Sequence, residues 1–165
     1  MSDPAALVTE NADAFHAALP EGGVLLGLDL GTRTIGTALC DAGWRFATAG
    51  KTLAKGKFSA DRAAIAELVA ARGVRGLVIG LPLNMDGSAG PRVQATRAFA
   101  RNIAVPPWSL SLPVLLWDER WSTTSAQRDM IAQDFSRAKR AERIDSHAAA
   151  VILQAAIDRL AGGMF

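Results

Sequence analysis

The stretch "GLDLGTRTIG", residues 27–36, places a single acid in an apolar segment and follows it closely with a glycine. The surrounding pattern predicts β-strands over residues 24–31 and 35–42, joined by a connection short enough for a hairpin. A buried strand favours Val, Ile or Leu, so Asp29 near the end of the first strand is a candidate functional residue. The alternative is that Asp29 only forms the turn, since aspartate is common before glycine in turns.

Further along the chain, strands alternate with helices. We predict strands over residues 45–52, 76–83 and 114–120, and helices over residues 58–72, 91–104, 124–135 and 145–160. This order predicts an α/β fold with a five-stranded mixed sheet flanked by helices and right-handed crossovers between parallel strands. Residues 3–19 predict a further helix that ends before Pro20. We therefore expect an N-terminal helical extension over residues 1–22 and a single domain over residues 23–165.

The composition limits the classes of protein that need to be considered. A chain of 165 residues is long enough for one domain that buries about 70% of its unfolded surface. Half of the residues are apolar and 21% are charged, which is typical of a globular rather than a disordered chain. A single cysteine, Cys40, excludes an internal disulfide, and the sequence has neither a membrane-length apolar run nor a signal-peptide pattern. We expect a cytoplasmic protein without a membrane partner.

Acids recur where the predicted parallel strands end. Asp29 ends the first strand, Asp118 and Glu119 end the fifth, and Asp145 begins the last predicted helix. Ligands of open α/β sheets gather beyond the carboxyl ends of the strands, so these carboxylates are expected to converge there. Converging carboxylates repel one another unless a cation lies between them, and Mg²⁺ accepts such oxygen ligands together with water and phosphate.

Four blocks of sequence resemble the motifs of one family. They are "GLDLGTRTIGTALCD" (27–41), "LVIGLPLNMDGSAG" (77–90), "WDERWSTTSAQ" (117–127) and "RIDSHAAAVILQAAID" (143–158). In this order and spacing they resemble the YqgF family, also called RuvX, of pre-16S rRNA nucleases or Holliday junction resolvases, over about residues 23–161. The resemblance implies an RNase H-like fold, with Asp29, Glu119 and Asp145 as the catalytic and metal-binding carboxylates.

Three features depart from the family pattern. The first 20 residues lie outside it, Trp121 replaces the usual Leu, and Arg143 stands where Lys is common. None of them changes an acid, but Arg and Lys are not interchangeable at a phosphate contact.

Each of the other acids has an alternative interpretation. Asp145 precedes an apolar helical face and could be the N-cap of that helix. Asp118 is better explained by an ion pair with Arg120 than by metal binding. Glu119 points to the opposite strand face from Asp118 and, on the family pattern, is the better ligand.

Basic residues near these acids are candidates for holding substrate phosphates. The segment "SRAKRAER" (136–143) contributes Arg137, Lys139, Arg140 and Arg143, directly before Asp145. Arg33 and Arg120 each lie within four residues of a candidate ligand, and Asn84 lies in the loop "NMDGSAG", where backbone N–H groups suit an anion. The alternative for the basic segment is a solvated surface.

The residues and the resemblance together predict a metal-dependent nuclease. Two Mg²⁺ or Mn²⁺ ions about 4 Å apart would be held by the three acids and would hydrolyse a phosphodiester bond. The family implies 5′-end processing of pre-16S rRNA during ribosome biogenesis. Alternatives are a Holliday junction resolvase acting on branched DNA, or a weakly active nucleic-acid-binding factor in ribosome assembly or transcription. The first motif also resembles that of actin-like ATPases and sugar kinases, but these need two lobes and a longer chain. The oligomeric state is not predicted.

Overall fold

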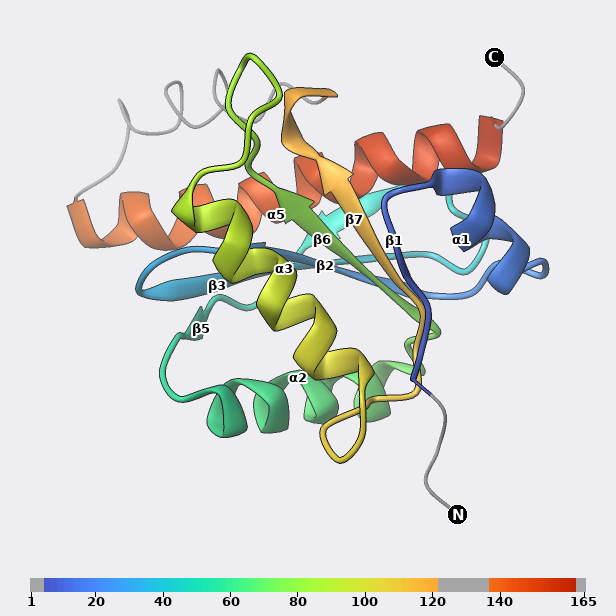
Figure 1. The fold of residues 1–165 in the computed structure, drawn as a ribbon, viewed down its shortest axis with the longest axis horizontal. Helices are drawn as coiled ribbons and strands as arrows, with labels where there is room; N and C mark the ends of the chain where they lie inside the picture. Colours follow the sequence, from blue (N-terminus) through green and yellow to red (C-terminus); the bar gives the residue numbers. More distant parts are fainter. Residues whose placement is uncertain (1–4, 122–136, 163–165) are drawn as a thin grey trace.

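The fold is a central sheet with helices on both of its faces (Figure 1). The computed structural model describes residues 5–121 and 137–162, and for residues 137–145 it describes the backbone. The helix predicted over residues 124–135 lies outside the described residues. The predicted α/β class, a mixed sheet flanked by helices, is confirmed.

Seven strands form the sheet in the order β1-β7-β6-β2-β3-β4, with β5 paired to β3. Their bounds are β1 Val8–Thr9, β2 Leu25–Leu30, β3 Thr34–Cys40, β4 Ala47–Ala49, β5 Leu53–Ala54, β6 Gly76–Leu81 and β7 Val114–Asp118. The strands β1, β7, β6 and β2 run parallel, whereas β3 is antiparallel to β2, β4 and β5. All five predicted strands are present, as β2, β3, β4, β6 and β7. The sequence pattern does not predict the two-residue strands β1 and β5.

Two helices cover one face of the sheet, and both have the predicted bounds. They are α2 (Phe58–Arg72) and α3 (Pro91–Ala104). Helix α2 ends at Gly73, whose φ of 61° is left-handed and favours glycine, and Pro91 opens the first turn of α3. No helix among the described residues is long and apolar enough to cross a membrane.

Helix α5 (Arg137–Gly162) covers the opposite face and approaches β2 closely. A Cβ added at Gly27 would lie 2.9 Å from the Cβ of Leu153 and 3.2 Å from the carbonyl oxygen of Ala149. A glycine is therefore needed in β2 at this point, because any side chain would push the helix off the sheet.

The predicted start of this last helix at residue 145 is wrong. The helix already includes Arg137, because the basic segment consists largely of Ala, Arg, Lys and Glu and contains no Gly or Pro that would stop it. Asp145 therefore lies inside the helix, and its interpretation as an N-cap is also wrong.

The helix predicted over residues 3–19 is confirmed only over residues 12–18. The segment forms β1, which pairs with β7, and then α1 (Ala12–Ala18), whose N-cap Asn11 accepts a hydrogen bond from the N–H of Ala14. Phe15 of α1 is fully buried, and a Cβ added at Gly76, the first residue of β6, would lie 2.9 Å from its ring. The segment thus contributes to the sheet and to the core. The boundary at residue 22 between an extension and the domain stays a prediction.

Candidate active site

The alternation of side chains along β2 places Asp29 on the face of the sheet covered by α5. Leu26, Leu28 and Leu30 belong to the core beneath α2 and α3, whereas Leu25 belongs to the core beneath α5. Successive side chains of a strand point to opposite faces, so Asp29 shares the face of Leu25. Its carboxylate lies near the carboxyl end of β2, and the residue is only 2% exposed.

Gly80 of β6 lies between Asp29 and Glu119. The parallel register of β2 and β6 pairs Leu28 with Ile79, and continuing it by one residue brings Asp29 level with Gly80. A Cβ added at Gly80 would lie 3.2 Å from both Cγ and Cδ of Glu119, and 2.6 Å from Cδ1 of Ile152 in α5. The side chain of Glu119 therefore lies over Gly80. The structure brings the first two predicted acids to the same face and the same edge of the sheet.

Glu119 itself follows β7 in the short 3₁₀ helix η1 (Glu119–Trp121) and is half-buried. Both acids have interactions with other groups in the structure.

The position of Asp145 follows from the direction of α5. Arg159 in the last turns of α5 pairs with Asp13 of α1, and α1 packs at the amino end of β6 through Phe15. The first half of α5 therefore lies toward the carboxyl ends of the parallel strands.

The spacing of residues along the two elements refines this position. Ala149 lies over Gly27, and two strand residues onward to Asp29 span about 6.6 Å, while four helix residues back to Asp145 span about 6 Å. Position 145 of the helix backbone is thus about level with Asp29. The side chain of Asp145 lies outside the described residues.

Asp118 lies on the other face of the sheet and is paired with Arg120. Nε of Arg120 donates to both carboxylate oxygens of Asp118 at 3.1 Å, and Nη2 donates to Oδ2 at 2.7 Å. The backbone N–H of Arg120 adds a fourth hydrogen bond, to Oδ1 at 2.9 Å. Burial alone would raise the pKa of Asp118, but the hydrogen bonds from Arg120 outweigh burial and hold that pKa below its ordinary value. The predicted ion pair is confirmed.

Replacing Arg120 with leucine is expected to raise the pKa of Asp118 from its lowered value, because the side-chain hydrogen bonds and the positive charge are lost while burial and the backbone hydrogen bond remain. In the wild type this pair contributes stability above about pH 4, the ordinary aspartate pKa, and the contribution is lost as the pH falls through the lower folded pKa. The loss of stability in Arg120→Leu should therefore be largest near pH 7 and should shrink toward pH 3 in urea unfolding. Arg101→Leu, at an exposed arginine of α3, is the control, and an equal pH dependence in both variants would contradict the assignment.

The other predicted phosphate-binding residues are spread along the carboxyl edge of the sheet. Arg33 is exposed in the turn after β2. Asn84 lies in the loop after β6, where its Nδ2 donates to Oγ of Ser88 at 3.0 Å. Nη1 of Arg120 donates to the carbonyl oxygen of Met85 at 3.3 Å, which links β7 to this loop. The side chains of Arg137, Lys139, Arg140 and Arg143 lie outside the described residues, although their backbone is helical. Their roles in binding phosphate stay predictions.

Among the residues whose side chains the structure describes, no three or more His, Cys, Asp or Glu side chains are grouped to hold a metal ion. The third predicted ligand, Asp145, is not among these residues. Carboxylate oxygens are the ligands that Mg²⁺ and Mn²⁺ favour, so Asp29 and Glu119 fit an ion of this kind. The three-carboxylate site stays a prediction.

Sequence reasoning missed Gly80, whose missing side chain leaves the space that Glu119 occupies. A glycine inside the otherwise aliphatic strand "GLVIGL" was the available signal, because such a glycine marks the close approach of another group. Reasoning from sequence also missed Lys55 and Arg92, which come together near the end of β2.

The mixed sheet flanked by helices, with two acids at its carboxyl edge, has an RNase H-like fold, the fold of RuvC. The solved structure titled "T. thermophilus RuvC in complex with Holliday junction substrate" matches with a TM-score of 0.50 and 12% identity, covering 81% of this chain and 92% of that chain. At this identity the likeness shows the fold alone.

The chain belongs to the RuvX family, whose sequence model, described as "Holliday junction resolvase", matches residues 23–159. A relative from Novosphingobium aromaticivorans is 64% identical over 159 residues, which are 96% of this chain and 100% of the relative. A relative from Zymomonas mobilis is 52% identical over 152 residues, or 92% and 91% of the two chains. Both are named "Putative pre-16S rRNA nuclease". The family resemblance of the four sequence blocks is confirmed.

Proposed function

We propose that this protein is a metal-dependent nuclease that hydrolyses phosphodiester bonds in the 5′-end processing of pre-16S rRNA during ribosome biogenesis. The observation that carries the proposal is the placement of Asp29 and Glu119 on one face at the carboxyl edge of the sheet, separated by Gly80. The backbone of α5 at residue 145 is about level with Asp29 along the strand direction, which supports Asp145 as a third ligand. The names of the relatives support the choice of RNA as substrate.

Asp29, Glu119 and Asp145 would hold Mg²⁺ or Mn²⁺ through their carboxylate oxygens. Bound there, two such ions would supply an activated water and would stabilise the leaving oxygen of an in-line displacement. The fold holds the carboxylates of these residues in position for this chemistry. Asp29 is fixed by the strand that carries it and by its burial, and Glu119 by the turn of η1 and its contact over Gly80. Ligands held on strands and a packed helix lose little freedom when they bind an ion.

The function is tested by incubating the purified protein with two substrates, precursor 16S rRNA and a four-way DNA junction, in Mg²⁺, in Mn²⁺ and in EDTA. We expect metal-dependent cleavage of the RNA near its mature 5′ end and none in EDTA. Cleavage of the junction alone would favour resolution of branched DNA, the second candidate, which the description of the family supports. Tight binding without cleavage of either substrate would favour a role in ribosome assembly or transcription.

The proposal also covers the cellular compartment in which the protein acts. We propose that the protein acts in the cytoplasm on nucleic acid, since its single thiol, Cys40, is buried and unpaired and its relatives are named for ribosomal RNA.

Replacing Arg137, Lys139 and Arg140 together with alanine is expected to weaken binding but to leave the maximal cleavage rate nearly unchanged. The substitutions remove charges that would contact phosphates but no proposed metal ligand. If three contacts are lost, the slope of log affinity against log salt flattens by about 2 to 3 units. The slope is measured by fluorescence anisotropy of a labelled RNA with metal-free protein.

The matched control removes three exposed arginines at the opposite edge of the sheet, Arg72, Arg75 and Arg101. We expect this variant to keep the wild-type slope. An unchanged slope in the first variant would show that the basic segment is only solvated surface, and would leave Arg33, Arg120 and Arg143 as candidates for holding the backbone.

A further inference from the structure

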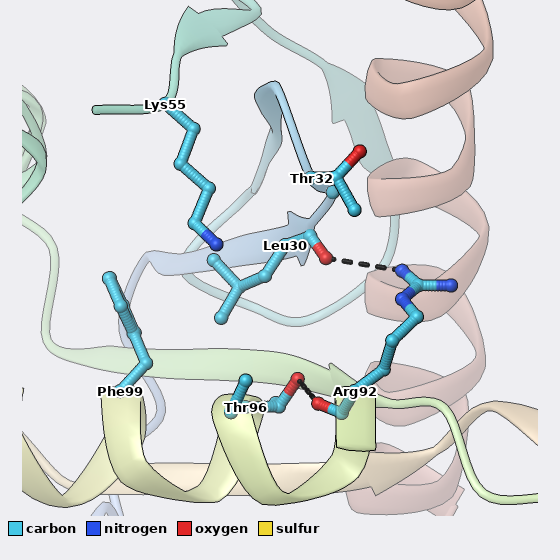
Figure 2. A pocket seen from close by; sticks show the side chains of 8 residues that line it. Leu30, Thr32, Lys55, Arg92, Thr96 and Phe99 are labelled. Atoms are coloured by element: carbon cyan, nitrogen blue, oxygen red, sulfur yellow. Dashed lines mark hydrogen bonds between the residues drawn. The ribbon is translucent and has the colours of Figure 1, made fainter. Parts of the chain in front are cut away.

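A cavity of about 130 Å³ lies at the carboxyl end of β2, on the face of the sheet opposite to Asp29 (Figure 2). Three parts of the chain build it: the end of β2 with the turn after it, the segment after β5, and α3 from its first turn to Phe99. Its walls are formed by Leu30, Gly31, Thr32, Lys55, Arg92, Ala95, Thr96 and Phe99. Leu30 and Phe99 belong to the core beneath α2 and α3, which places the cavity on that face.

The cavity is lined by two cations and no acid. Figure 2 shows the ammonium group of Lys55 and the guanidinium group of Arg92 approaching the end of β2 from two sides. Within the described part of the chain, neither cation is paired with a carboxylate. Two unneutralised cations beside one cavity repel each other, so an anion between them would be stabilising.

The walls hold these donors in place. Nη2 of Arg92 donates to the carbonyl oxygen of Leu30 at 3.2 Å, which fixes one arm of the guanidinium and leaves its other N–H groups free to bind a ligand. The backbone N–H of Lys55 donates to the carbonyl oxygen of Arg33 at 2.9 Å, which ties the segment of Lys55 to the turn after β2. Thr32 also lines this wall, with its hydroxyl directed away from Arg92 (Figure 2). An ammonium group and a guanidinium group together suit a phosphate.

The cavity lies close to the carboxylates but is separated from them by the sheet. Asp29 and Leu30 are consecutive in β2 and point to opposite faces, so the turn over residues 31–33 passes between the two sites. A single small anion would gain nothing from this proximity. A polymer with a phosphate at every residue could cross the turn and occupy both sites at once.

We propose that Lys55 and Arg92 bind a backbone phosphate of the nucleic-acid substrate, distinct from the phosphate that is cleaved. The inference rests on the proposed nuclease function, because it assumes that a nucleic-acid chain passes Asp29. The cavity then positions the chain across the carboxyl edge and fixes which phosphodiester bond reaches the carboxylates.

The test compares Lys55→Met with Lys57→Met in metal-free protein. Lys57 lies two residues away, is exposed and does not line the cavity. Binding of a labelled precursor 16S rRNA fragment and of a labelled four-way DNA junction is measured by fluorescence anisotropy over a range of salt. We expect Lys55→Met to flatten the salt slope by about one unit and Lys57→Met to leave it unchanged. The nucleic acid whose salt slope flattens, the RNA fragment or the DNA junction, is the source of the phosphate.

Substrates with a single neutral methylphosphonate extend the test to one position. At one position along the substrate, the methylphosphonate should weaken binding by the wild type. The same substrate should bind Lys55→Met and Arg92→Gln no more weakly than the unmodified one does, because these variants already lack the contact. If Lys55→Met and Lys57→Met have equal salt slopes while the wild type binds and cleaves the substrate, the phosphate site is overturned and the nuclease function stands. If Lys55→Met alone loses binding and the wild type cleaves neither substrate, the phosphate site is supported and the nuclease function is overturned. A wild type that binds neither nucleic acid overturns both.

Discussion

Asp29→Asn is expected to lower the rate of RNA cleavage by at least about a thousandfold while the protein stays folded. The substitution removes one negative charge from the proposed metal site without changing the volume of the side chain. A metal ion contributes several kcal/mol of transition-state stabilisation, and each 1.36 kcal/mol is a factor of ten in rate. The rate is measured with saturating RNA in Mg²⁺ and in Mn²⁺, and the fold is checked by circular dichroism and urea unfolding.

Asp158→Asn is the matched control, since this acid lies in the last turns of α5, at the far end of the helix from position 145. It should cleave at the wild-type rate. Metal-free Asp29→Asn should bind RNA as well as the wild type or more tightly, because one source of repulsion toward phosphate is gone. Wild-type cleavage by purified, folded Asp29→Asn would exclude the proposed mechanism.

Gly80→Ala is expected to lower both activity and stability. The added Cβ would lie 2.6 Å from Cδ1 of Ile152 and 3.2 Å from Cδ of Glu119, so both side chains must move. Overpacking of this kind costs about 1 to 3 kcal/mol in the free energy of unfolding. Displacement of Glu119, a proposed metal ligand, should also reduce cleavage, by up to about tenfold where the shift approaches the roughly 0.5 Å within which catalytic geometry must be held.

A second substitution separates the two effects. Ile152→Val removes Cδ1, the atom in closest contact, so Gly80→Ala with Ile152→Val should regain part of the lost stability in urea unfolding. Glu119 stays displaced, and cleavage should stay low. Gly56→Ala is the control, because a Cβ there would meet no atom within 4 Å. Full recovery of cleavage in the double variant would show that the contact with Ile152, and not displacement of Glu119, caused the loss of activity.

Much of the fold could be predicted because its signals are local. Gly73 and Pro91 mark the end of one helix and the start of another, and the bounds of α2 and α3 agree with the prediction. Strand β1 could not be predicted in this way, because it has only two residues and depends on pairing with Val114 and Leu115, far along the chain. The early start of α5 was missed because charge suggested an exposed segment, whereas helix propensity decided its structure.

Part of the candidate site could also be predicted from sequence, and part could not. Asp29 and Glu119 could be singled out because each ends a strand, and the strand period correctly separated Glu119 from Asp118. The cavity of Lys55 and Arg92 could not be predicted, since its walls come from three elements whose approach depends on the packed core. No sequence spacing encodes such an approach.

The pairing of β1 with β7 has a consequence for how the protein can be handled. A chain trimmed to residues 23–159, the part that the family model matches, would leave β7 as an edge strand. The unpaired N–H and C=O groups of an open edge are a template for strands of other molecules, and the site once filled by Phe15 would expose apolar surface. Such a fragment would be prone to self-association and precipitation even with every carboxylate in place. The solubility of residues 23–159 is thus expected to depend on residues that the family model does not match.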